Sequence, residues 1–227
     1  MNRILLAAMA LFAVCVPLLL LTTFLRVATS YSALYEYGFK KYDVSAASGI
    51  SPADLDRVAD GLVHYFNSNE DLFTLTITRN GQQVPLFHEN EAVHFRDVKG
   101  LISFGHLVQW ITLGYVMAFA FAVSLWKGRG AKKDLFKAGL WGTGLTIALI
   151  AALGIAALVN FDQLFLAFHK TFFNNNLWMA FSGDVMTTLF PEAFFRDALV
   201  MIVGAMAFTA ILVFVLSWLG LRRAKKD

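Results

Sequence analysis

Two of the five histidines are placed where they could meet at one membrane surface. His94 lies in HFRDVKGL, just before an apolar stretch, and His169 lies in FHKTFFNNN, just after another. If residues 94–97 are helical, Asp97 shares a face with His94 at i,i+3. A carboxylate there could fix the imidazole tautomer and support its protonation. The spacing indicates a histidine pair suited to general acid–base catalysis, while surface or packing roles stay open for each histidine alone.

The chain lacks the motifs of several common enzyme classes. It contains no GxSxG, HExxH or P-loop sequence, and its single cysteine, Cys15, lies inside an apolar stretch. A metal site could be assembled from His94, Asp97, His169 and Asp184, but their spacing matches no recognised ligand motif. We therefore expect no metal and no cofactor.

The elements that must hold these residues are membrane helices. Of the 227 residues, 58% are hydrophobic and 15% charged, whereas globular proteins average about 45–50% and about 25%. The excess lies in four uncharged stretches, each long enough to cross a bilayer core of about 30 Å. The first is longer than the apolar part of a signal peptide, so we interpret it as a retained anchor. We predict an α-helical membrane protein with four transmembrane helices, at residues 1–25, 101–126, 138–159 and 198–221.

Basic residues predict how these helices are oriented. Five lysines and arginines lie in the 127–137 loop and four in the 222–227 tail. The positive-inside rule places both segments, and with them both termini, in the cytoplasm. Residues 26–100 and 160–197 then face outward, and 26–100 carries ten acidic against seven basic residues. The net charge of +3 follows from this asymmetry, and we expect no nucleic-acid partner.

The first outer segment, 26–100, has the pattern of a small folded α+β extracytoplasmic cap. Residues 31–42 indicate a helix, and Ser51-Pro52-Ala53-Asp54 is typical of a helix start. Alternation over 72–79 predicts a strand, Asn80-Gly81 a two-residue turn and 82–87 the returning strand. Because an isolated hairpin is marginally stable, it should pack on the cap helices or the membrane.

The second outer segment, 160–197, is unusually aromatic. Nine phenylalanines and one tryptophan lie within residues 161–195, with few charges. Aromatic rings favour the bilayer interface, so two interfacial helices forming an aromatic belt are one interpretation. An aromatic-lined lipid pocket is the other, and composition does not separate them.

Three blocks of sequence carry a resemblance to a known family. They are SALYEYGFKKYDVSAASGIS, LFHENEAVHFRDVKGL, and FHKTFFNNNLWM followed by LFPEAFFRDA. In this combination the chain resembles the bacterial lipoprotein intramolecular transacylases and related integral membrane proteins. The resemblance implies four transmembrane helices with an extracytoplasmic cap, a multi-pass location in the bacterial plasma membrane and an active site at its outer face.

The resemblance also implies roles for individual residues. The two catalytic histidines correspond to His94 and His169. Beside them we expect Asp97, Lys99, Asn175 and Asp184 as supporting residues and Phe168, Phe172, Phe173 and Trp178 as the lining of the substrate pocket. Simpler roles stay open: Lys99 could extend its amine to the interface from a helix end, Asn175 could cap a helix, and Trp178 could anchor the belt.

The implied reaction moves the sn-2 acyl chain of a diacylglyceryl-cysteine to the α-amine of the same cysteine. The reacting atoms close an eight-membered ring, so the substrate supplies its own nucleophile. The implied partners are diacylglyceryl-modified bacterial lipoproteins and membrane lipid. Two alternatives remain: another membrane acyltransferase or lipid hydrolase acting on free lipid, and a non-catalytic lipid-binding or accessory protein.

Overall fold

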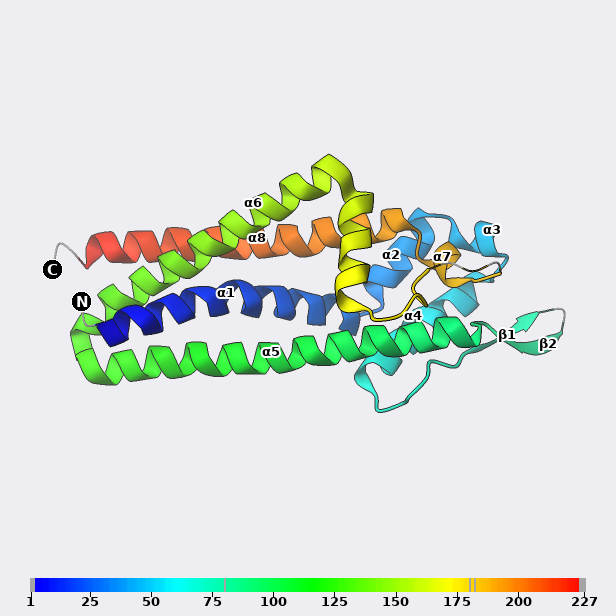
Figure 1. The fold of residues 1–227 in the computed structure, drawn as a ribbon, viewed down its shortest axis with the longest axis horizontal. Helices are drawn as coiled ribbons and strands as arrows, with labels where there is room; N and C mark the ends of the chain where they lie inside the picture. Colours follow the sequence, from blue (N-terminus) through cyan, green and yellow to red (C-terminus); the bar gives the residue numbers. More distant parts are fainter. Residues whose placement is uncertain (1–2, 80, 180, 182, 225–227) are drawn as a thin grey trace. The chain divides into compact units, whose positions relative to one another are not determined.

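The computed structural model describes residues 3–79, 81–179, 181 and 183–224 (Figure 1). In chain order its elements are α1 (Arg3–Ser30), α2 (Ala33–Lys41), α3 (Val44–Ser48), α4 (Pro52–Asn67), β1 (Thr76–Arg79), β2 (Gln82–Pro85), α5 (Glu89–Lys127), η1 (Gly128–Gly130), α6 (Ala131–Phe172), α7 (Met186–Leu189) and α8 (Glu192–Arg223). The turn residue Asn80 and the tail residues Lys225 and Lys226 lie outside the described residues.

Four helices, α1, α5, α6 and α8, are long and apolar enough to cross a membrane, which confirms the predicted four-helix membrane fold. The chain divides into two compact units. The helical unit comprises Met1–Phe24, Gly105–Asn160 and Met201–Asp227, and the cap unit comprises Leu25–Phe104 and Phe161–Val200.

Close backbone packing holds the helical unit together. A Cβ added to Gly142 of α6 would lie 2.6 Å from Val16 of α1, so only glycine permits this approach. The Tyr115 hydroxyl of α5 donates a hydrogen bond of 2.9 Å to the carbonyl of Ala8. α1, α5 and α6 therefore contact one another through small residues and buried polar groups.

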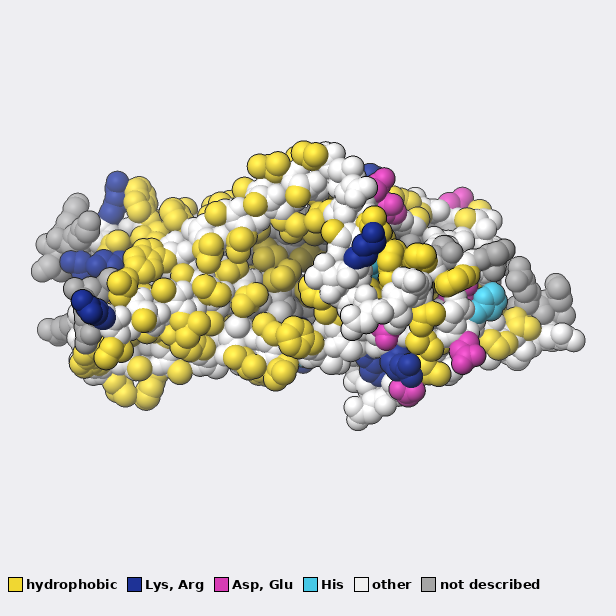
Figure 2. All heavy atoms as spheres, in the orientation of Figure 1, with side chains coloured by type: hydrophobic (Ala, Val, Ile, Leu, Met, Phe, Trp, Pro, Cys, Tyr) yellow, Lys and Arg dark blue, Asp and Glu magenta, His cyan; other side chains and the backbone are white. Residues whose placement is uncertain are grey.

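The surface of the helical unit agrees with a lipid environment. In Figure 2, hydrophobic side chains are spread over the visible face of the long helices, and basic side chains gather at the end where α8 finishes. Leu158 and Val159 are 89% and 79% exposed, which an aqueous surface would disfavour. The connection from α5 to α6 is shorter than the predicted 127–137 loop: Gly128 (φ +52°) ends α5, and the helix-favouring AKKDLFK already belongs to α6.

The cap unit contains the short helices and the hairpin. Ser51 caps α4, and its hydroxyl accepts a hydrogen bond from the amide of Asp54. Buried residues of α4, including Val58, Leu62 and Tyr65, share one core with Phe73 and with Phe95 of α5. At another edge of the unit, Asp197 of α8 accepts hydrogen bonds from Lys41 and Tyr42, each 2.6 Å long.

The hairpin and the aromatic segment differ in detail from the sequence prediction. β1 begins at Thr76 and β2 ends at Pro85, so both strands are shorter than 72–79 and 82–87. α6 continues to Phe172 after non-helical backbone at Asn160 (φ −161°, ψ 94°). The outer segment therefore consists of the end of α6, an irregular stretch, α7 and the start of α8.

Candidate active site

The structure brings the two predicted catalytic histidines together. His94 lies in the second turn of α5, and His169 lies in the last turn of α6. Their side chains come from residues 75 positions apart, yet the ring centroids are 6.3 Å from each other with an interplanar angle of 26°. Both residues are buried, at 6% and 8% exposure, and both belong to the cap unit. Two imidazoles at this separation can act on one small group between them.

Aromatic rings enclose the pair. Phe173 contacts both imidazoles, with centroid distances of 5.0 Å to His94 and 5.5 Å to His169. His169 is further contacted by Phe165 at 4.2 Å, Trp178 at 5.0 Å and Phe168 at 5.3 Å. Rigid apolar walls of this kind exclude water and strengthen electrostatic interactions inside the site.

Hydrogen bonding distinguishes the two imidazoles. Nδ1 of His169 lies 2.8 Å from the carbonyl oxygen of Phe165, one helical turn earlier. A carbonyl only accepts, so Nδ1 carries the proton, and Nε2 of the neutral ring presents a lone pair. Nδ1 of His94 is buried, and no described residue hydrogen-bonds to it. The site thus offers a proton acceptor on His169 and an unsatisfied ring nitrogen on His94.

Burial keeps both imidazoles neutral. Both residues lie outside the predicted spans 101–126 and 138–159. Loss of hydration lowers the pKa of His94 to about 4, with repulsion from His169 as the second cause. Burial also lowers the pKa of His169, but the hydrogen bond to Phe165 opposes that change. His169 is therefore the member of the pair that more readily accepts a proton.

Asp97 contacts Asn175 instead of His94. Its Oδ2 accepts a hydrogen bond of 2.8 Å from Nδ2 of Asn175, and Oδ1 of Asn175 accepts one of 2.9 Å from the amide of Leu177. This hydrogen bond joins α5 to the loop after α6, and the charge of Asp97 still acts on His94, where it opposes the lowering of the imidazole pKa. That loop also carries Trp178, whose ring contacts His169, so we expect Asn175 to help position the aromatic wall.

We predict that Asn175→Ala lowers kcat by about fivefold and leaves the folded protein otherwise intact. The exposed Asn175 amide loses two hydrogen bonds, and a bond of this kind contributes about 1 kcal/mol. Asn174→Ala is the matched control, because Asn174 is also exposed and its side chain makes no hydrogen bond to a described residue. Equal kcat values for the two variants would contradict the positioning role.

Three other predicted site residues lie away from the histidine rings. Lys99 donates a hydrogen bond of 2.6 Å to the carbonyl of Glu70, and its amine lies 4.2 Å from the Tyr65 ring centroid. Phe172 is 51% exposed and contacts Phe168, with no ring contact to either histidine among the described residues. Asp184 accepts hydrogen bonds from Asn90, four residues before His94.

Sequence reasoning missed three residues that shape the site. Phe165 sets the tautomer of His169, and its i,i+4 spacing on a helix could have identified it. Glu91 is fully buried, and its two oxygens accept hydrogen bonds from the amides of His88 and Met186. The first bond resembles a capping box, which H-x-x-E could have suggested. Nothing local indicated that Asn90 pairs with Asp184.

The comparisons with known proteins concern the family and the fold. The family model of the lipoprotein intramolecular transacylase Lit matches residues 10–195. The solved membrane-integral Lit of Bacillus cereus is similar over 100% of both chains, with a TM-score of 0.82 and 20% identity. Two histidine variants of that enzyme, to alanine and to arginine, are similar with TM-scores of 0.77 and 0.70 at 20% and 21% identity. They cover 99% and 96% of this chain and 97% and 94% of their own. No curated protein matches the chain.

Proposed function

Because the chain belongs to the family of lipoprotein intramolecular transacylases, we propose that it moves the sn-2 acyl chain of a diacylglyceryl-cysteine to the α-amine of the same cysteine. The observation that carries this proposal is the buried, aromatic-enclosed pair of His94 and His169. Such a pair can transfer protons without a serine or cysteine nucleophile beside it, which suits a substrate that contains both the amine and the ester.

The reaction balances with the two histidines alone. The substrate nitrogen attacks the sn-2 carbonyl carbon, the bond from that carbon to the glycerol oxygen breaks, and the amine proton ends on the glycerol oxygen. The attack closes an eight-membered ring. Holding both arms in this geometry can contribute up to about 7–11 kcal/mol, and proton transfer typically adds about 10²–10⁴-fold.

The hydrogen bonds support a division of labour between the histidines. His169 Nε2 takes the proton from the nitrogen after attack, because its lone pair is available and its ring accepts a proton more readily than that of His94. His94 stays neutral and donates an N–H to the oxygen that becomes negative in the tetrahedral intermediate. His169 then returns its proton to the departing glycerol oxygen.

The low polarity of the site also acts on the substrate. Burial disfavours an ammonium group as it disfavours an imidazolium, so the amine enters in its neutral, nucleophilic form. Phe173 and Trp178, which pack on the histidines, keep out the water that would hydrolyse the ester. The basic segments support an orientation with both termini in the cytoplasm, so that this site works at the outer membrane face on lipoproteins and membrane lipid.

The pH dependence should separate the histidines from the substrate amine. An α-amine titrates at about 7.7–8.0, whereas the pKa of His94 is about 4 and that of His169 lies below its usual value. At about pH 6.5 we expect log(kcat/KM) to rise with a slope closer to one than to two, because histidines whose pKa values are lowered are already mostly neutral there and mainly the amine gains reactivity. A slope near two, in initial rates on a detergent-solubilised lipoprotein, would mean that a histidine of ordinary pKa must also deprotonate.

Tandem mass spectrometry of a reporter lipoprotein tests the proposed reaction. The transfer is an isomerisation, so the total mass is unchanged and fragmentation must distinguish an amide-linked chain from two glycerol esters. We expect the N-acyl, monoacylglyceryl peptide with the wild-type protein and with His64→Ala, a variant at an exposed histidine. His94→Ala and His169→Ala should leave both esters in place. Two esters with the folded wild-type protein would refute the lipoprotein substrate.

A further inference from the structure

A cluster of one histidine and two carboxylates lies at the start of α5, apart from the catalytic pair. His88 precedes the helix, Glu91 lies in its first turn, and Asp184 lies in the irregular stretch before α7. Nδ1 of His88 is 3.5 Å from Oδ1 of Asp184 and 4.0 Å from Oε2 of Glu91. One ligand atom from each residue falls within 4.8 Å of the others. We propose that these three side chains bind a divalent zinc ion.

The burial of the two carboxylates supports a cation at this point. The Glu91 and Asp184 side chains are 0% and 1% exposed, and among the described residues neither forms an ion pair with a lysine or arginine. Two adjacent buried anions repel each other and lose their hydration, which requires compensation. Backbone amides supply part of it, and a divalent ion between the carboxylates supplies the rest.

The hydrogen bonds around the carboxylates resemble the support that metal ligands have in other proteins. Glu91 accepts from the amides of His88 and Met186, at 2.8 and 2.7 Å. Asp184 accepts from the amide of Phe181 at 2.8 Å and from Asn90 at 3.2 Å. Ligating carboxylates are usually held by such outer contacts, which fix their direction before the ion arrives.

The spacing of the three ligands fits zinc. Tetrahedral bonds of about 2.0–2.2 Å place two ligand atoms about 3.3–3.6 Å apart. The two distances from His88, 3.5 and 4.0 Å, come close to this, and all three ligand atoms lie within 4.8 Å of one another. Small movements of the exposed His88 ring and of the carboxylates toward the ion would close the remainder. An imidazole with two carboxylates favours zinc over calcium or magnesium, which prefer oxygen ligands alone. The exposed side of His88 leaves room for water as the fourth ligand.

The backbone beside His88 requires glycine at position 183. Gly183 has φ +94°, a conformation that other residues rarely adopt, and a Cβ there would lie 3.4 Å from Cε1 of His88. The site would clamp the irregular stretch before α7 onto the start of α5, two turns before His94. Its role is structural, and it stands independently of the proposed transacylase reaction.

Zinc binding to the purified, tag-free protein in detergent tests the site. After chelation and removal of the chelator, zinc titrated by calorimetry should bind with about one ion per chain. His88→Ala and Asp184→Asn should each weaken the affinity at least tenfold, because each removes one ligand. His64→Ala is the matched control: His64 Nε2 also lies 3.3 Å from a carboxylate, that of Glu70, but both side chains are exposed. Its affinity should equal that of the wild type.

Three outcomes would overturn the proposal. The wild-type protein could bind no zinc, His88→Ala could bind it as tightly as the wild type, or His94→Ala could abolish binding while His88→Ala leaves it unchanged. The last result would assign the ion to the catalytic pair. His88 is 58% exposed at its side chain, so its alanine variant should fold even where Asp184→Asn does not.

Discussion

Replacing His169 with alanine is expected to slow acyl transfer by about 10²–10⁴-fold, the range typical of a lost general acid–base group. His169 holds its Nδ1 proton against Phe165 and leaves Nε2 to accept the amine proton. The variant removes this acceptor and opens a space among the surrounding aromatic rings. Initial rates on a purified lipoprotein substrate measure the loss.

Imidazole added to His169→Ala separates chemistry from folding. The space left by the side chain lies between Phe165, Phe173 and Trp178, so a free imidazole can occupy it and take up the proton. We expect added imidazole to restore part of the activity of His169→Ala. It would restore none if the variant were inactive only because it is misfolded. A rate for His169→Ala within a factor of about three of the wild type would contradict the assignment of His169 as the base.

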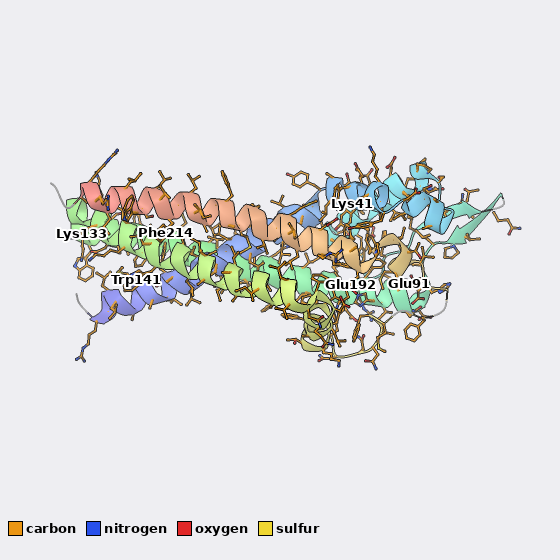
Figure 3. The ribbon with its side chains drawn as sticks, turned by 90° about the horizontal axis from the view of Figure 1, so that it is seen from above. Lys41, Glu91, Lys133, Trp141, Glu192 and Phe214 are labelled. Atoms are coloured by element: carbon orange, nitrogen blue, oxygen red, sulfur yellow. The ribbon has the colours of Figure 1, made fainter. Side chains whose placement is uncertain are left out.

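Glu91→Ala is expected to have the largest effect on stability. Glu91, labelled in Figure 3, lies at the start of α5, and its carboxylate satisfies the amides of His88 and Met186. Alanine would leave the two part-buried N–H groups without this partner, at about 1–3 kcal/mol each. The unfolding temperature should fall by roughly 8–16 °C for a total near 4 kcal/mol in a chain of this size. Intrinsic tryptophan fluorescence during heating measures it.

Glu91→Gln provides the intermediate case. Glutamine has nearly the same shape, but it accepts hydrogen bonds at one oxygen only and turns an amide donor toward the other N–H. Its unfolding temperature should lie between those of the wild type and Glu91→Ala. If the alanine and glutamine variants both unfold at the same temperature as the wild type, the two hydrogen bonds do not stabilise the junction of α5 with the stretch before α7.

The membrane helices could be predicted because hydropathy and length alone determine whether a segment can span a bilayer. The role of Ser51 as a helix cap could be predicted equally well, because such a cap depends on residues only three positions apart. Helix ends were less predictable. α5 begins at Glu89, twelve residues before the predicted span, because charged residues such as Glu, Arg and Lys favour helix as readily as Leu or Met does, so hydropathy does not mark the start of the helix.

The pairing of His94 with His169 was accessible from the sequence because both should lie at the same membrane depth. The partner of Asp97 was not. A spacing of i,i+3 places Asp97 on a face with His94 but does not decide between that ring and another donor, and the amide of Asn175 comes from the loop after α6. The hydrogen bond from Lys99 to the carbonyl of Glu70 likewise depends on the folding of the cap, because the two residues lie far apart in the sequence.

A crossover experiment tests the central claim most directly, namely that the pair of histidines moves an acyl chain within one lipoprotein molecule. Two lipoproteins of different peptide mass, one carrying an isotopically heavy sn-2 chain and the other a light one, are mixed with the purified protein. Fragmentation then shows which amide-linked chain each peptide carries. The account predicts that every peptide keeps its own chain. Exchanged chains in statistical proportion would show that the acyl group leaves its molecule and would contradict intramolecular transfer.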